Sequence, residues 1–84
     1  MTPVFESERD GVRLYDNRIE VDHRGWVASS TRSKYLVDVQ EAVYTGGRDV
    51  YVNTRSGGMF VKFHRKETAR SFFDALNEAM PGPM

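Results

Sequence analysis

Hydrophobic positions between Lys66 and Met80 repeat with the period of an α-helix. Glu67 stands in the first turn, where the helix dipole favours negative charge, and Pro81 cannot continue a helix. The pattern predicts a helix over residues 66–80 that must bury its two adjacent phenylalanines, because an isolated helix of this length is marginal in water. The residues of the apolar stripe are Ala69, Phe72, Phe73, Leu76, Ala79 and Met80.

Two earlier stretches alternate apolar and polar residues, as half-buried β-strands do. Residues 12–14 and 19–21 flank Asp16-Asn17, which predicts a hairpin with a two-residue turn. Residues 49–54 and 59–64 flank a glycine-rich turn at 55–58, which predicts a second hairpin leading into the helix. Glycines 46 and 47 turn the chain before this second hairpin.

The remaining segments allow more than one interpretation. Residues 3–5 could form a short edge strand, and residues 26–28 indicate a short third strand that runs into a loop at 29–33. Residues 34–45 predict either one bent strand or two, with a kink near 38–40. A helix over the same residues is an alternative that their β-branched content disfavours.

Strands followed by one terminal helix make the predicted class α+β. We expect five to seven short strands in a strongly bent antiparallel sheet or partly open β-barrel, capped by the C-terminal helix. At 84 residues the chain has room for one domain, residues 1–84, with a core over about 11–80 and a short tail at 81–84.

The amino-acid composition limits the kinds of function that the chain can have. Twelve basic and twelve acidic side chains cancel, so no overall charge attracts nucleic acid or anionic lipid, and such binding needs a local patch. The absence of cysteine excludes disulfides and thiolate metal sites and fits a cytoplasmic location. No apolar run is long enough to span a membrane, and no signal peptide is expected.

Three segments together resemble the bacterial pleckstrin-homology-like (PH-like) domains. They are GVRLYDNRIEV, SKYLVDVQEAV and DVYVNTRSGGMFVKFHRKETARSFFDALNEA, which span residues 11–79. The resemblance lies in the hydrophobic pattern and a few turn residues. It implies a bent seven-stranded barrel with a C-terminal helix that serves in lipid, peptide or protein recognition or in self-assembly. It carries over no ligand residue.

Aromatic side chains supply one candidate interface. If the alternate residues of the second hairpin face the helix, Tyr51 and Phe60 point outward on neighbouring strands and form a patch for self-association or a partner protein. Tyr35 and Trp26 are further candidates, and the single tryptophan could be either a core plug or an interface anchor.

Basic side chains supply a second candidate. An anion patch for lipid headgroups, nucleic acid or an acidic peptide would combine Arg24, Lys34, Arg65, Lys66 and Arg70. A solvated rim balanced by nearby acidic residues explains the same cluster, and neutrality of the chain favours that explanation.

No catalytic or metal-binding arrangement is visible. The two histidines, His23 and His64, have no second ligand at metal spacing, and no serine stands in a nucleophile motif. We therefore expect a bacterial, cytoplasmic, non-enzymatic interaction module without cofactor or small-molecule substrate. Its partner is a protein or a second copy, reached through the outer sheet face or an edge strand. Anion, membrane-surface or nucleic-acid binding is the alternative.

Overall fold

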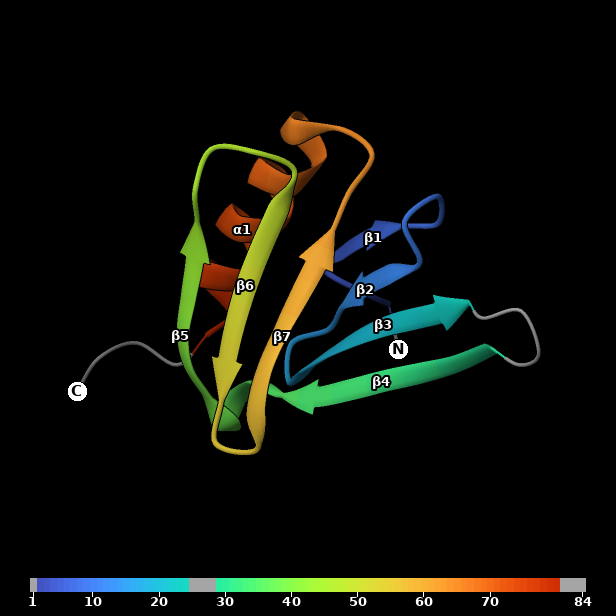
Figure 1. Ribbon diagram of the computed structural model, residues 1–84. Coiled ribbons are helices and arrows are strands. Elements are labelled where there is room, and N and C mark those ends of the chain that lie inside the picture. Colours follow the sequence, from blue (N-terminus) through green and yellow to red (C-terminus); the bar gives the residue numbers. More distant parts are fainter. Residues whose placement is uncertain (1, 25–28, 81–84) are drawn as a thin grey trace.

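The computed structural model describes residues 2–24 and 29–80, and of residues 23, 24, 29 and 30 it describes the backbone alone. Seven strands and a 3₁₀ turn precede one helix (Figure 1). In chain order the elements are β1 (Phe5–Ser7), β2 (Val12–Leu14), β3 (Arg18–Arg24), β4 (Ser29–Tyr35), η1 (Leu36–Asp38), β5 (Val39–Tyr44), β6 (Asp49–Thr54), β7 (Gly57–Lys62) and α1 (Lys66–Ala79).

The strands form two antiparallel sheets, so the α+β class is confirmed. One sheet has the order β1-β2-β3-β4 and the other has the order β5-β6-β7. In both sheets each strand pairs with its neighbour in the sequence, which is the topology that short turns permit. The predicted strongly bent sheet or partly open barrel is not seen, because the two sheets are hydrogen-bonded separately among the described residues.

Both hairpins predicted from alternation are present. The chain reverses between β2 and β3 at Asp16-Asn17, where the N–H of Tyr15 donates to the carbonyl of Arg18 at 2.8 Å. The hairpin of β6 and β7 turns at residues 55–56, two residues tighter than predicted, because Gly57 and Gly58 already belong to β7. Gly57 has a φ of +126°, a conformation that favours glycine over residues with a side chain.

The polar segment at residues 29–33 was predicted as a loop, and this prediction was wrong. It belongs to β4, which pairs with β3 over seven consecutive residues from Arg18↔Tyr35 to Arg24↔Ser29. Thr31, Arg32 and Ser33 are all exposed, so no core selects apolar residues here. The strand is held by backbone pairing and by polar contacts such as the 2.9 Å hydrogen bond from Thr31 to Asp22. The third strand predicted at residues 26–28 lies outside the described residues.

Residues 34–45 form the end of one strand, a turn and a second strand. Strand β4 ends at Tyr35, and η1 then buries Leu36 in the core. Strand β5 follows, with a shift of register between Val39 and Glu41. The irregularity predicted near residues 38–40 is thus present, and the only helical structure in this stretch is the 3₁₀ turn that precedes it.

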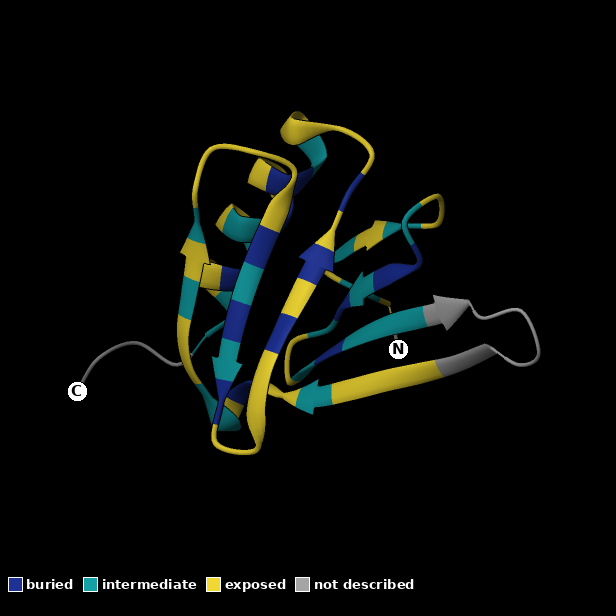
Figure 2. Cartoon of the chain, viewed as in Figure 1, coloured by how far each residue is buried: buried dark blue, intermediate teal, exposed yellow. Residues whose placement is uncertain are grey.

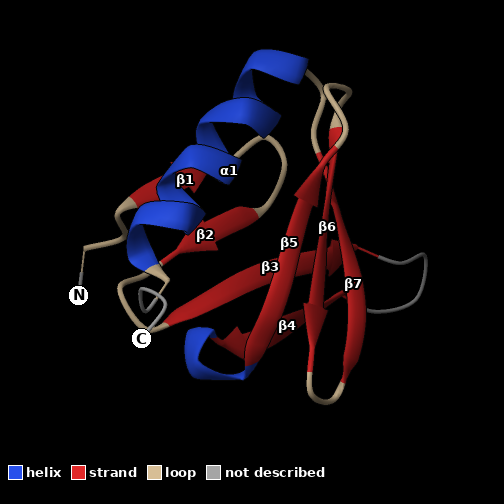
Figure 3. Ribbon diagram, turned by 90° about the vertical axis from the view of Figure 1, so that its left-hand side faces the viewer, coloured by secondary structure: helices blue, strands red, loops and turns tan. Residues whose placement is uncertain are grey.

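Helix α1 is confirmed, and it joins the two sheets. It contacts β5 and β6 of one sheet and β1 and β2 of the other, and Figure 3 shows it lying across β1 and β2 beside the three-stranded sheet. Phe72 is fully buried between Phe5 and Phe63, with ring centroids at 5.5 and 5.3 Å. Phe73 is only half-buried and packs on Tyr44, so one of the two phenylalanines fills the core.

Candidate functional site

The outer face of β5, β6 and β7 carries a row of apolar side chains. Val43 on β5 pairs with Tyr51 on β6, and Tyr51 pairs with Phe60 on β7. The Tyr51 and Phe60 rings lie with their centroids 4.8 Å apart, within the range of favourable aromatic pairs. Phe60 is 62% exposed and Val43 is also exposed. We call these three residues the aromatic row.

Alternation along β6 and β7 explains why the row faces outward. The opposite face of these strands supplies core residues, as the alternating colours in Figure 2 show. Side chains on a strand point to alternate faces, so burial of one set exposes the other. The predicted placement of Tyr51 and Phe60 as outward neighbours therefore agrees with the geometry. The core residues that fix it are Val50, Val52, Met59 and Val61.

Gly58 makes room for the Tyr51 ring. A Cβ atom placed on Gly58 would overlap the hydroxyl and ring atoms of Tyr51, which shows that the ring lies across the backbone of β7. A glycine within a strand often marks such a close approach. The position of Tyr51 in the row thus depends on a small residue on the next strand.

Charged and polar residues of both signs border the aromatic row. On one side Asp49 pairs with Lys62, and on the other Glu41 pairs with Asn53, which in turn pairs with Gly58. An apolar centre with a polar rim is the usual arrangement of a protein contact surface.

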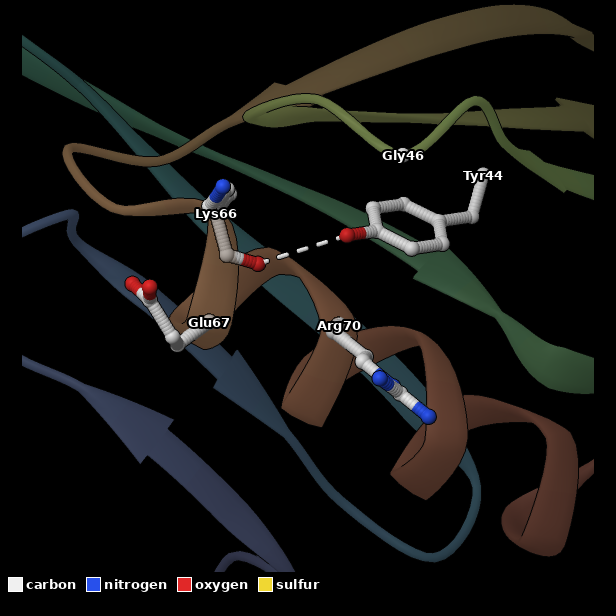
Figure 4. Close-up of a pocket in the computed structure, with 5 residues that line it drawn as sticks. All are labelled: Tyr44, Gly46, Lys66, Glu67 and Arg70. Carbon is white, nitrogen blue, oxygen red and sulfur yellow. Dashed lines mark hydrogen bonds between the residues drawn. The ribbon is translucent and has the colours of Figure 1, made fainter.

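A shallow pocket of about 460 Å³ lies at the start of α1, lined by Tyr44, Gly46, Lys66, Glu67 and Arg70. The Tyr44 hydroxyl donates a long hydrogen bond, 3.5 Å, to the Lys66 carbonyl (Figure 4). In the same view the guanidinium of Arg70 and the carboxylate of Glu67 point to opposite sides. Catalysis needs polar groups that converge on one point, and these do not.

The five residues of the predicted anion patch are not gathered in one place. Lys66 and Arg70 line the pocket at the start of α1, and exposed Arg65 directly precedes that helix. Lys34 donates a 2.8 Å hydrogen bond to Ser56, beyond the other end of β6. Arg24 ends β3, and its side chain is not described.

The other two predicted interface residues are not part of the aromatic row. Tyr35 ends β4 in the four-stranded sheet and is 58% exposed. Trp26 lies outside the described residues, so its role as core or interface stays a prediction.

A buried carboxylate that the sequence did not reveal links the two sheets. The side chain of Asp10, in the β1–β2 turn, is 4% exposed. It accepts a hydrogen bond from Ser7 at 2.6 Å and from the backbone N–H of His64 at 2.9 Å, and its Oδ1 lies 2.6 Å from His64 Nδ1. Burial raises the pKa of Asp10, but these hydrogen bonds outweigh burial and the net direction is down.

A second polar cluster holds β2 against β3. Arg13 reaches Glu20 at 3.2 Å and Asp22 at 2.7 Å, and Arg18 reaches Glu20 at 2.9 Å. The hydrogen bond from Arg18 lowers the pKa of Glu20, burial opposes it, and Arg13 adds to the lowering. The hydrogen bond with Asp22 raises the pKa of Arg13. The contacts of Arg13 with Glu20 and Asp22 cross from β2 to β3, as expected on a strand face, whereas Arg18 and Glu20 lie on the same strand.

Two further searches of the described residues gave negative results. No group of three or more His, Asp or Glu side chains lies close enough together to hold a metal ion. None of the described helices has the length and apolar character needed to cross a membrane.

The chain was also compared with known proteins. No protein-family model matches it, and neither curated proteins nor solved structures give a significant match.

Proposed function

We propose that this chain is a non-enzymatic interaction module whose contact surface is the outer face of β5, β6 and β7. The observation that supports the proposal best is the aromatic row, in which Phe60 is 62% exposed beside Tyr51. Aromatic residues are enriched at protein interfaces and often carry much of the binding energy. Exposed apolar patches rimmed by polar groups commonly mark such interfaces.

The occupant that the face fits is a second copy of this chain. Consider two copies stacked face to face about a two-fold axis that runs across the strands at the level of the row. Each residue of the aromatic row then meets its own counterpart, and the two ends of the face are exchanged. Asp49 of one copy faces Asn53 of the other, and Lys62 faces Gly58, so these positions oppose no like charges.

The contact is expected to be weak and reversible. A standard stable interface buries roughly 800 Å² on each partner. One row of three side chains with its rim, on strands of six residues, covers less than that. We therefore expect association that rises with protein concentration.

Light scattering or sedimentation over a wide concentration range tests this proposal. The wild-type chain should show concentration-dependent association, which Phe60→Glu should abolish and Tyr51→Ala should weaken. Val37→Glu is the matched control, because Val37 is 69% exposed on η1 and lies outside the row. A chain that is monomeric throughout, or that loses association equally in Val37→Glu and Phe60→Glu, would contradict the proposal.

We also infer affiliation with the PH-like fold and a cytoplasmic location. Seven antiparallel strands followed by a C-terminal helix support the affiliation in outline, and the cysteine-free composition supports the location. An experimental structure tests the affiliation. Seven strands paired in sequence order and followed by the helix would support it, and a different strand order or a helix elsewhere in the chain would contradict it.

A further inference from the structure

Residues from three connections line one hollow: the β1–β2 turn, the β5–β6 loop and the end of β7 with its link to α1. The hollow has a volume of about 260 Å³. Its position differs from both the aromatic row and the pocket at the start of α1. The residues that line it are Arg9, Asp10, Arg48, Lys62, Phe63 and His64.

Positive charge dominates the lining. Arg9, Arg48 and Lys62 come from three different segments, and all three are exposed. In the part of the chain that the structure describes, none of them forms an ion pair within 4.0 Å. Asp49, the cross-strand partner of Lys62, is the acidic residue that could compete for it, and these two form no such pair either.

Asp10 supplies the one carboxylate in the lining, and its oxygens already accept hydrogen bonds within the protein. Asp10 is turned inward and accepts hydrogen bonds from Ser7 and from the backbone of His64. These hydrogen bonds hold the loop in place, and little of the Asp10 carboxylate is exposed to solvent. The three surrounding cations outnumber it, so the hollow keeps a net positive charge.

Asp10 also fixes the orientation of the imidazole. With Nδ1 of His64 engaged at 2.6 Å, the other ring nitrogen, Nε2, is directed away from the carboxylate, and the side chain is 60% exposed. A carboxylate behind Nδ1 is the usual way in which proteins hold a histidine that acts through Nε2.

From this geometry we propose that the hollow is a binding site for a phosphate group. Arginine presents forked N–H donors that match phosphate oxygens, and lysine adds a point charge. Three cations on separate segments can contact a dianion from several sides. We therefore expect the hollow to bind a dianion more tightly than a monovalent ion. The phosphate could belong to a soluble phosphate or to a lipid headgroup, and the test separates these sources.

The test is an NMR titration of the folded chain with inorganic phosphate at constant ionic strength. Its second arm is co-sedimentation with phosphatidylcholine vesicles containing phosphatidic acid, with phosphatidylcholine vesicles as the blank. The charge-removing variant is Arg48→Gln with Lys62→Gln. Its matched control is Arg32→Gln with Arg55→Gln, which removes the same charge from exposed sites on β4 and beyond the other end of β6.

Phosphate should shift the amide signals of Arg9, Arg48 and His64 together. The charge-removing variant should weaken binding about tenfold, which corresponds to about 1.4 kcal/mol shared between the two lost charges. The control should change it less than about twofold. Binding of phosphate identifies a soluble source, and variant-sensitive binding to the vesicles alone identifies a headgroup. No binding in either arm, or equal weakening in the control, overturns the site.

Discussion

The β3–β4 and β6–β7 hairpins have similar lengths and pairing but different stabilising interactions. In β6–β7, alternate residues such as Val52 and Val61 are fully buried. The β3–β4 hairpin extends away from the helix and the second sheet (Figure 1), and its residues Thr31 to Ser33 are exposed. Apart from Ile19, which is buried at the start of β3, the β3–β4 hairpin therefore depends mainly on backbone pairing and side-chain polar contacts, and the β6–β7 hairpin depends on the core. This comparison indicates which substitutions should lower the stability of the fold most.

The largest expected effect is at the contact between the sheets. Phe72→Ala should lower the free energy of unfolding by about 3–5 kcal/mol, the usual cost of removing a buried phenylalanine. The ring contacts Phe5 of the first sheet and Phe63 beyond the second, so both should be loosened. Urea unfolding followed by circular dichroism measures the loss. Phe73→Ala should cost less, since Phe73 is half-buried, and an equal or larger loss there would contradict this assignment.

The two hairpins can be compared directly with one truncation in each. Val61→Ala should cost about 2 kcal/mol, because it removes two buried methyl groups and leaves a cavity. Ser33→Ala on exposed β4 should stay within about 0.5 kcal/mol of the wild type. The same urea experiment serves both variants. Similar losses in the two would show that the hairpins are stabilised alike.

The same contrast explains what could be predicted from sequence. The helix and both alternating hairpins are fixed by local patterns of burial, which the sequence displays. Strand β4 was missed because its residues Thr31 to Ser33 are exposed, and nothing in a polar segment specifies pairing to β3. The 3₁₀ turn at Leu36 was not predicted, because one buried residue on its own gives no repeating hydrophobic pattern in the sequence.

In the candidate sites too, the sequence predicted residue positions where a local pattern determines them and not where distant segments meet. The outward positions of Tyr51 and Phe60 follow from alternation, so they could be predicted. The contact between Asp10 and His64 joins residues far apart in the sequence, and no local signal marks it. The five-residue basic patch was predicted from closeness in the sequence for Arg65, Lys66 and Arg70, but Lys34 lies at the other end of β6 from them.

Acid should affect the four-stranded sheet before the three-stranded one. Asp10 and Glu20 have folded-state pKa values below their ordinary ones. Their contribution is therefore complete above about pH 5, where the unfolded carboxyls are ionised, and it is lost as pH falls through the lower folded values. Among the described residues, no strand of the second sheet takes part in an ion pair.

Amide hydrogen exchange near pH 3 checks this order: protection should fall in β2 and β3 before it falls in β6 and β7. Asp10→Asn should cost about 1 kcal/mol at neutral pH and should reduce the loss of stability on acidification. Simultaneous loss of protection in both sheets would contradict the prediction.

A small effect is also expected on the outer face of the three-stranded sheet. Gly58→Ala should cost roughly 0.5–1 kcal/mol, less than overpacking in a core, because the displaced Tyr51 ring has solvent beside it. The ring signals of Tyr51 should shift in the NMR spectrum. Gly47→Ala is the control, since a Cβ there meets nothing within 4 Å. Unchanged Tyr51 signals in Gly58→Ala would show that the ring does not depend on the glycine.

The packing of Phe5 against Phe72 has a consequence for how the chain acquires its structure during synthesis. A ribosome makes Phe5 long before Phe72, so the aromatic centre cannot close until α1 has emerged. Until then β1 and β2 lack the helix that covers them. The apolar side chains that β1 and β2 turn toward the helix therefore stay uncovered until the last segment of the chain has been made.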